Sequence, residues 1–348
     1  MAYSSITKPT DYFNTVLYTG NGSSQSITGV GHQPDWTWVK SRGSTAFHLS
    51  TDSVRGVTKQ LYPNADTAEN TDLSHITAFN TDGFSVGSAG DVNGNSLNLV
   101  SWNWKAGGSA SSNSNGSITS SVSVSTDAGF SIVSYTGNAT SGATLGHGLG
   151  IKPAMIISKN RDEAQNWFCY HKSLGATDYI RLNLTNASGS ATSIWNDTEP
   201  TTSVFSVGND TATNGSSDKI IAYCFADVKG YSKFGKYTGN GNADGTFVYT
   251  GFKPAWVMFK EAVGTSPDNW FIYDNKRSTF NPLEKTLRAN TNGAETDLSA
   301  TAIDMLSNGF KLRTADTGLN ESGGTYIFMA FAEAPFVTAG TKAAGTAR

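Results

Sequence analysis

Oxygen-bearing side chains alternate along one short stretch that could bind a cation. The stretch DVNGNS (91–96) places Asp91, Asn93 and Asn95 at every second position, as at the start of a calcium-binding loop. Such a loop ends on a bidentate glutamate, which is missing here. Because Asn/Gly turns recur throughout the chain, we interpret the stretch as a hairpin turn and predict no metal or other cofactor. Asp91, Asn93 and Asn95 remain the candidate metal loop.

Histidine, serine and cysteine could supply nucleophilic or acid–base chemistry. His32 occupies a repeat position that Ile151 and Phe252 fill elsewhere, which is typical of packing rather than of ligation. The spacing of the other histidines, at 48, 75, 147 and 171, singles out no nucleophile–base–orienter set. Cys169 and Cys224 lie in apolar runs, so we predict buried free thiols. No phosphate loop, HExxH or CxxC motif is present, and we predict that the protein is not an enzyme.

Two aromatic residues in polar contexts could form stacking surfaces for sugar rings. Trp195 lies in SIWNDTEP and Tyr62 in QLYPNAD, each beside amide and carboxylate side chains. The alternative is that both rings cover the rim of a sheet as ordinary aromatics. We keep Trp195 and Tyr62 as candidate ligand-binding residues. No catalytic carboxylate pair can be assigned, because the separation that decides glycosidase chemistry cannot be read from a sequence.

The composition restricts the class of protein and its partners. Charged residues make up 15% of the 348 residues and glycine occurs 37 times, with abundant Ser, Thr, Asn and aromatic residues; this is typical of a β-protein rich in turns. The net charge of −3 gives no basic footprint for nucleic acid. No apolar run approaches the ~20 residues of a membrane helix. The start MAYSSITKPT has no signal-type apolar core, so we expect synthesis in the cytoplasm and no membrane insertion.

Four anchors recur three times along the chain. The motif YTGN starts at Tyr18, Tyr135 and Tyr237. A proline break before an apolar strand (DWTWVK, AMIISK, AWVMFK) stands at Pro34, Pro153 and Pro254. A later aromatic strand begins at Phe84, Phe205 and Phe310. An apolar strand then closes each segment, at 97–104, 219–228 and 326–336. Such self-similarity predicts a repeat architecture.

Each repeat has the period and length of an antiparallel β-sandwich. Apolar residues alternate with period two between tight-turn pairs, over about 95–110 residues. We therefore predict an all-β chain of three tandem sandwiches, at 12–104, 117–228 and 229–336, with terminal arms at 1–11 and 337–348. The Gly/Ser-rich segment 105–116 is predicted to be a flexible linker, whereas 225–240 joins the second and third repeats with almost no polar spacer.

Four finer expectations follow from the same pattern. The prolines should lie at equivalent bends, and Trp36, Met155 and Trp256, each two residues further on, should occupy equivalent buried positions. The stretch 117–137 should open the second repeat with a hairpin. The segments TDLSHITAFN (71–80) and TDLSATAIDML (296–306) have weak helical character, and each is expected to form one or two helical turns.

The phrases SWNWKAGG, AGFSIVSYTGN, NWFCYHKSLG and GYSKFGKYTGNGNADGTFVYTGFKPAWVMFK carry a resemblance. Over residues 12–336 the chain resembles a repeat in structural proteins of tailed bacteriophages, described as tail-fibre-like or as virion proteins with lectin-like, concanavalin-type sandwiches. The resemblance implies a virion location and a binding or structural role, and it assigns no binding residue. Because the repeats begin by residue 12, with neither a long anchor nor coiled-coil heptads before them, a compact component on the capsid, tail tube or baseplate is favoured over a long distal fibre.

These observations leave several functions open. The first is a non-enzymatic virion surface protein, tail-associated, that binds a host-surface glycan or protein, neighbouring virion proteins and copies of itself. The alternative is a capsid decoration protein whose flat faces and terminal arms clamp neighbouring subunits. A virion enzyme that cleaves polysaccharide is the third. Duplication favours the first two, because repeated binding surfaces add avidity without new chemistry.

Overall fold

Alternating apolar residues, bounded by Gly- and Asn-rich turns, form antiparallel strands along nearly the whole chain. The computed structural model describes residues 4–336, and within them the chain is all-β with a few short helical turns. We call residues 12–104, 117–228 and 229–336 units 1, 2 and 3. The predicted arms lie outside the described residues at 1–3 and 337–348.

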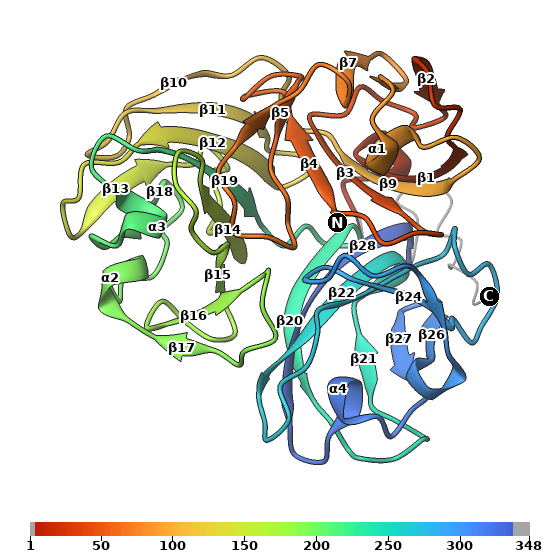
Figure 1. The fold of residues 1–348 in the computed structure, drawn as a ribbon. Coiled ribbons are helices and arrows are strands. Elements are labelled where there is room, and N and C mark those ends of the chain that lie inside the picture. Colours follow the sequence, from red (N-terminus) through yellow and green to blue (C-terminus); the bar gives the residue numbers. More distant parts are fainter. Residues whose placement is uncertain (1–3, 337–348) are drawn as a thin grey trace.

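The elements follow one another in a similar order in the three units, except that unit 2 begins with an extra strand and has a short helix in place of one strand of the small sheet (Figure 1). Unit 1 contains β1 (Phe13–Thr19), β2 (Gln25–Thr28), β3 (Trp36–Ser41), β4 (Leu49–Asp52), β5 (Lys59–Gln60), β6 (Asn70–Thr71), β7 (Ile76–Asn80), β8 (Gly83–Val86), α1 (Gly90–Asn93) and β9 (Asn98–Trp104). After β10 (Ser111–Asn113), unit 2 contains β11 (Ser120–Ser125), β12 (Phe130–Thr136), β13 (Ala143–Gly146), β14 (Met155–Asn160), β15 (Phe168–His171), β16 (Asp178–Arg181), β17 (Gly189–Ser190), α2 (Thr192–Trp195), β18 (Val204–Val207), α3 (Thr211–Asn214) and β19 (Lys219–Phe225).

Unit 3 closes the chain with the succession of unit 1 and one added helical turn. It contains β20 (Ser232–Thr238), β21 (Phe247–Tyr249), β22 (Phe252–Val263), β23 (Phe271–Asp274), β24 (Lys285–Arg288), β25 (Thr296–Asp297), η2 (Ser299–Thr301), β26 (Ile303–Leu306), β27 (Gly309–Leu312), α4 (Thr317–Asn320) and β28 (Thr325–Pro335). The short helix η1 (Pro9–Asp11) precedes unit 1.

Each unit packs a small sheet over a large one in a β-sandwich-like pair. The large sheets of residues 4–336 have the orders β1-β9-β3-β4, β10-β11-β12-β19-β14-β15-β16-β17 and β20-β28-β22-β23-β24-β25. The small sheets have the orders β2-β8-β7, β13-β18 and β21-β27-β26. In each pair the closing strand lies between the opening strand and the strand that follows the proline. The same pairing order therefore occurs in all three units, and each pair encloses its own apolar cluster.

The outer faces of the large sheets meet in a common central core, around which the units lie as three lobes (Figure 1). Trp36 of unit 1 stacks on Tyr223 of unit 2 with ring centroids 4.3 Å apart, and Trp104 of unit 1 lies edge-on to Trp256 of unit 3 at 5.8 Å. Period two explains the arrangement, because alternate residues of one strand face the unit's own cluster and the shared core. The strands after the proline breaks and the closing strands are consequently buried on both faces.

The structure confirms the predicted burial after the proline breaks. Trp36, Met155 and Trp256 are at most 1% exposed. They pair with Trp104, Phe225 and Phe331, the corresponding residues of the closing strands. The hairpin predicted at the start of unit 2 is also present, as β11 and β12.

The segment 105–116 differs from the predicted flexible linker. The backbone N–H groups of Ala106 and Gly108 donate to the carboxylate of Asp35, at 2.7 and 3.2 Å. Residues Ser111–Asn113 form β10, which pairs with β11. Its composition is typical of a flexible coil, but its backbone groups form hydrogen bonds with Asp35 of unit 1 and with β11 of unit 2.

The predicted helical turns are only partly present. Residues 71–80 contain β7 instead of a helix, whereas 296–306 contains the single turn η2 followed by β26. Pairing of β7 with β8 overrides the weak local preference of this stretch. No helix in residues 4–336 is long and apolar enough to cross a membrane.

Candidate functional site

The candidate metal loop forms α1 and the turn after it, and Asn93 is occupied by structural hydrogen bonds. The buried Asn93 Oδ1 accepts from the Asn21 backbone N–H at 3.0 Å and from Gln25 Nε2 at 2.8 Å, while its Nδ2 donates to the Gly87 carbonyl. The exposed Asn95 lies on the following turn. Within residues 4–336, no group of three or more His, Cys, Asp or Glu side chains is placed to hold a metal ion. The three residues therefore do not converge on one site.

The Asn93 arrangement recurs and explains the YTGN motif. In units 2 and 3, Asn214 and Asn320 accept from the backbone N–H of the motif asparagines Asn138 and Asn240, both at 2.9 Å. The motif tyrosines donate to the carbonyl just before each buried asparagine, at 2.7–2.8 Å. At Gly20, Gly137 and Gly239 a Cβ atom would lie 2.2 Å from a carbonyl oxygen, so only glycine fits. The sequence places an asparagine just before each closing strand, but it indicated only a possible cation ligand for Asn93 and no role for Asn214 or Asn320.

Asp91 pairs with a histidine. His75 Nδ1 lies 3.2 Å from Asp72 and Nε2 lies 3.0 Å from Asp91. Burial lowers the pKa of His75, but the two carboxylates outweigh it, and the net pKa is raised. This pair fixes the start of α1 against the turn before β7.

The two candidate sugar-stacking residues, Trp195 and Tyr62, differ in their exposure to solvent. Trp195 is 1% exposed and lies edge-on to Tyr170 inside unit 2, so it offers no stacking face and the prediction for it is wrong. Because its sequence neighbours are polar, the sequence did not indicate that α2 directs the Trp195 ring into the interior of unit 2. Tyr62 is half-buried against Phe47, with ring centroids 5.4 Å apart. Phe47 is 48% exposed, which makes it the more accessible ring of that pair.

The remaining candidates for chemistry are buried. Cys169 and Cys224 are free and fully buried, and burial raises the pKa of both thiols. Burial also lowers the pKa of His171 to about 4, and its Nε2 lies 3.2 Å from the Phe328 carbonyl. His171 thus links units 2 and 3, and none of these buried groups is open to a substrate.

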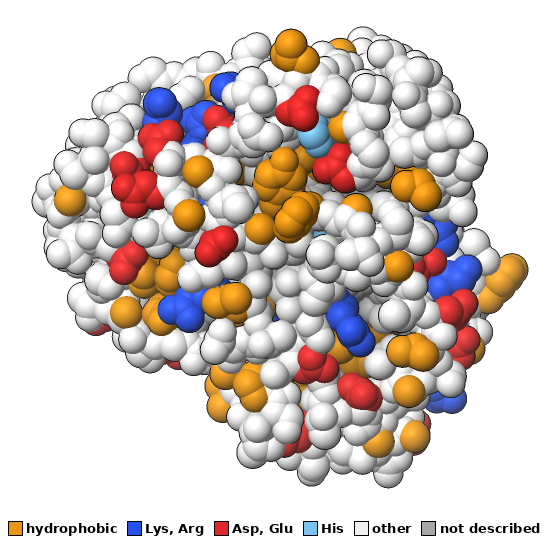
Figure 2. All heavy atoms as spheres, viewed as in Figure 1, with side chains coloured by type: hydrophobic (Ala, Val, Ile, Leu, Met, Phe, Trp, Pro, Cys, Tyr) orange, Lys and Arg blue, Asp and Glu red, His pale blue; other side chains and the backbone are white. Residues whose placement is uncertain are grey.

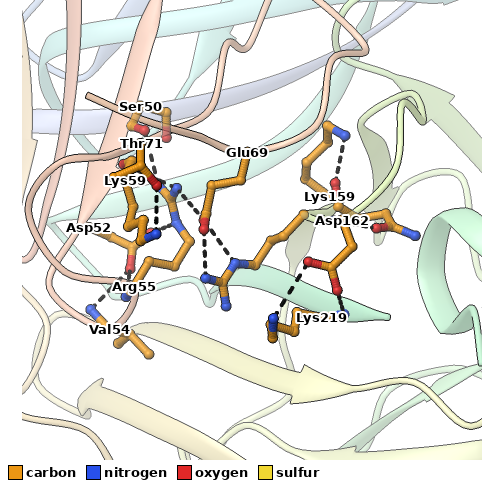
Figure 3. Close-up of polar contacts among 12 residues, drawn as sticks. Ser50, Asp52, Val54, Arg55, Lys59, Glu69, Thr71, Lys159, Asp162 and Lys219 are labelled. Carbon is orange, nitrogen blue, oxygen red and sulfur yellow. Dashed lines mark hydrogen bonds and ion pairs between the residues drawn. The ribbon is translucent and has the colours of Figure 1, made fainter. Parts of the chain in front are cut away.

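A polar network joins unit 1 to unit 2 (Figure 3). Glu69 accepts a bidentate pair of hydrogen bonds from Arg161, both at 2.9 Å, and a third from Arg55 at 3.1 Å. Arg55 also donates to the buried Asp52, which accepts from Tyr223 at 2.7 Å. Burial raises the pKa of Glu69, but the arginines outweigh it, and the net pKa is lowered. Glu69 is therefore a carboxylate that ties both units together.

The junction between units 3 and 1 contains the same network with other residues. Glu295 accepts from Arg42 at 2.8 and 3.0 Å and from Arg277 at 3.2 Å. Arg277 donates to Asp274, which accepts from Trp102 at 3.1 Å.

At the junction between units 2 and 3 the corresponding residues are uncharged. Ser188 occupies the place of Glu69 and donates through its N–H and Oγ to the Ala262 carbonyl, at 2.9 and 3.0 Å.

All three junctions share one further contact that sequence reasoning missed. In each unit a ring N–H just before β4, β15 or β23 donates to a backbone carbonyl of a neighbouring unit. The pairs are Trp167 to Tyr62, Trp270 to Arg181, and His48 to Arg288, at 2.9–3.1 Å.

Three lysines at equivalent positions of β3, β14 and β22 are fully buried: Lys40, Lys159 and Lys260. Burial lowers the pKa of each lysine to about 8. The repeated lysine in WVK, ISK and MFK was the available signal.

The surface feature suited to binding is a groove between β20 and β21 in unit 3. Two adjoining depressions of about 320 and 440 Å³ share Lys233 and Tyr249. Phe247 and Tyr249 are 44% and 56% exposed on its rim, and Lys236 lines it as well. We call it the β20–β21 groove. Elsewhere, the face drawn in Figure 2 shows small separate groups of hydrophobic side chains among acidic and basic ones.

Comparison with known proteins gives one match. A family model described as "Domain of unknown function (DUF7483)" matches residues 8–335. No curated protein and no solved structure matches significantly.

Proposed function

The chain belongs to the DUF7483 family, and we propose that it is a non-enzymatic bacteriophage virion surface protein of the tail-associated type. Its three sheet pairs are then tandem lectin-like, concanavalin-type β-sandwich repeats. The pairing order common to the units supports the repeats, and the sequence resemblance supports the virion location. The protein acts by binding a host-surface glycan or protein, or neighbouring virion subunits.

One observation carries the binding role. The units are fixed to one another by a shared core and by polar junctions, while the β20–β21 groove presents exposed aromatic rings and lysines on that rigid body. Pre-formed apolar grooves with a few polar groups are typical of binding sites. A rigid platform of this kind also avoids the ordering cost that a flexible binder would incur.

A capsid decoration protein is the second candidate. The three lobes around a common centre favour it (Figure 1), because a chain with approximate threefold arrangement can match a threefold position of a lattice.

Labelling particles with an antibody against the purified chain separates these functions. Label on the tail is the expected result, and label spread over the head would favour decoration. Particles that carry no label under conditions where a known virion protein is labelled would overturn the virion proposal.

A further inference from the structure

In each unit, the side of the large sheet at β1, β12 or β20 lies next to the small sheet, and we call the space between them the opening of the unit. Unit 2 closes its opening with the β10–β11 hairpin. Strand β11 pairs along the free edge of β12, with Val122 opposite Val133. At the other side of the opening, Ile118 N–H donates to the Thr144 carbonyl at 3.0 Å and Ser120 Oγ to the Gly146 carbonyl at 3.1 Å. The hairpin therefore bridges β12 and β13.

Unit 1 closes the same opening with one side chain. Asn14 of β1 donates through Nδ2 to the carbonyls of Gly29 and Val30, at 3.2 and 3.1 Å. These carbonyls follow β2, the strand that corresponds to β13 in unit 2.

Among residues 4–336, neither device is present in unit 3, and its opening is the β20–β21 groove. Alignment on the YTGN motif places Lys233 where unit 1 has Asn14. Strand β20 is at the edge of its sheet. Pairing of β21 with β27 places Phe247 and Tyr249 where unit 2 has Thr144 and Gly146, the residues that contact the hairpin. The positions that the hairpin covers in unit 2 therefore carry two exposed aromatic rings in unit 3.

The backbone of β20 is oriented to accept a strand. The N–H of Phe234 donates to Asp227 at 2.8 Å and therefore points away from β28. In an antiparallel strand the residue two positions on points the same way, so the backbone groups of Lys236 face the open edge. The groove is also basic: its one lining carboxylate within residues 4–336 is Asp227, which pairs with Lys172. Lys233 and Lys236 form no ion pair within those residues.

We propose that the β20–β21 groove binds an extended, acidic strand of a partner protein by addition to β20. The register follows from β11 on β12. If the partner strand lies on β20 as β11 lies on β12, its residue at the position of Ser121 faces Lys236. Its residue at the position of Val122 then faces Gly235, and its residue at the position of Val124 faces Lys233. Strand addition supplies main-chain hydrogen bonds, and opposite charges across the pair supply selectivity. The inference rests on the proposed binding function and specifies the partner's chemistry.

A synthetic peptide tests the proposal on the full chain. The probe is residues 117–126 of this protein carrying Ser121→Glu and Val124→Glu, and its matched control carries Lys at both positions. Fluorescence anisotropy should show the Glu peptide binding at least about tenfold more tightly than the Lys peptide, because two cross-strand pairs change from opposite to like charge. Hydrogen exchange should slow across 232–238 when the Glu peptide is bound.

Protein variants assign the effect to the groove. Lys233→Glu/Lys236→Glu should reverse the preference between the two peptides, while Lys276→Glu/Lys285→Glu, with the same charge change elsewhere in unit 3, should preserve it. Equal binding of both peptides, no binding, or protection at 130–136 instead of 232–238 would overturn the proposal. So would self-association that Lys233→Thr/Lys236→Thr increases, because the lysines would then guard the edge against pairing.

The two proposals fail separately. Labelled particles with no peptide binding would refute strand addition alone. Peptide binding with particles that carry no label would refute the virion role and leave the strand-binding groove.

Discussion

The junctions on either side of unit 1 differ from the junction between units 2 and 3. The first two carry a carboxylate held by two arginines, Glu69 and Glu295. The third has Ser188 and the Ala262 carbonyl in the same place. Units 2 and 3 are also tied by the chain itself, through a tight turn in which the N–H of Ser232 donates to the Val228 carbonyl at 2.9 Å. Charged networks therefore occur where no tight turn fixes the neighbouring unit.

This difference indicates what the ion pairs contribute. A buried ion pair adds little net stability over an apolar contact, but it strongly disfavours arrangements that leave one charge unpaired. The shared aromatic core can pack many ways, because apolar contacts are not directional. We infer that the core holds the units together and that the charged networks specify which edges meet.

The largest expected effect comes from the core. Trp256→Ala should lower the free energy of unfolding by about 3–5 kcal/mol, because the buried ring contacts aromatic rings of both unit 1 and unit 3. Urea denaturation measures the loss. The exposed Tyr249→Ala serves as control, with an expected change within about 0.5 kcal/mol. A loss below 1 kcal/mol for Trp256→Ala would show that the core does not join the units.

The junctions should respond unequally. Glu69→Gln should cost about 3 kcal/mol, because it leaves Arg55 and Arg161 without their shared carboxylate, and Glu295→Gln should cost a similar amount. Ser188→Ala removes one neutral hydrogen bond and should cost about 1 kcal/mol or less. Equal losses at all three positions, measured by the same denaturation, would contradict the distinction between charged and neutral junctions.

The smallest expected effect is a pH dependence of stability that arises from Glu261, next to the uncharged junction between units 2 and 3. Glu261 precedes Ala262, and burial, with the Glu321 carboxylate beside it, raises the pKa of Glu261 from 4.5 to about 7. The folded state thus binds a proton more tightly than the unfolded state between these values, so this group's contribution to stability is present below pH 4.5 and is lost as pH rises through 7. Buried histidines such as His171 act in the opposite direction.

A variant isolates the Glu261 contribution. Relative to the unchanged protein, Glu261→Gln should gain stability between pH 5 and pH 8, because its amide does not titrate. Comparison of the two proteins at each pH cancels the histidine contributions. A stability difference that stays constant from pH 5 to pH 8 would refute the raised pKa.

Much of the strand pattern could be predicted from the sequence, because period two and turn pairs are local signals. The buried positions of Trp36, Met155 and Trp256 followed directly from their distance to the prolines. The partners of those faces could not be predicted, since a residue buried against its own unit and one buried against a neighbour look alike in a sequence. Segment 105–116 was misread for a related reason: Ser and Gly fit a free coil as well as an edge strand.

The site was harder to predict than the fold. Trp195 stands among polar residues yet points inward from α2, while the exposed Phe247 and Tyr249 belong to a strand whose alternation resembles any other. Their significance comes from comparison with Thr144 and Gly146 under the hairpin of unit 2. That contrast requires knowledge of which edge each unit covers, which depends on tertiary pairing.

Limited proteolysis of the isolated protein tests most directly whether the three units form one body. Segment 105–116 should resist cleavage under native conditions, because the N–H groups of Ala106 and Gly108 donate to Asp35 and β10 is paired with β11. Cuts should then appear only with global unfolding, in step with loss of tryptophan fluorescence. Early cleavage within 105–116 that releases an intact fragment of units 2 and 3 would contradict the shared core and its junctions.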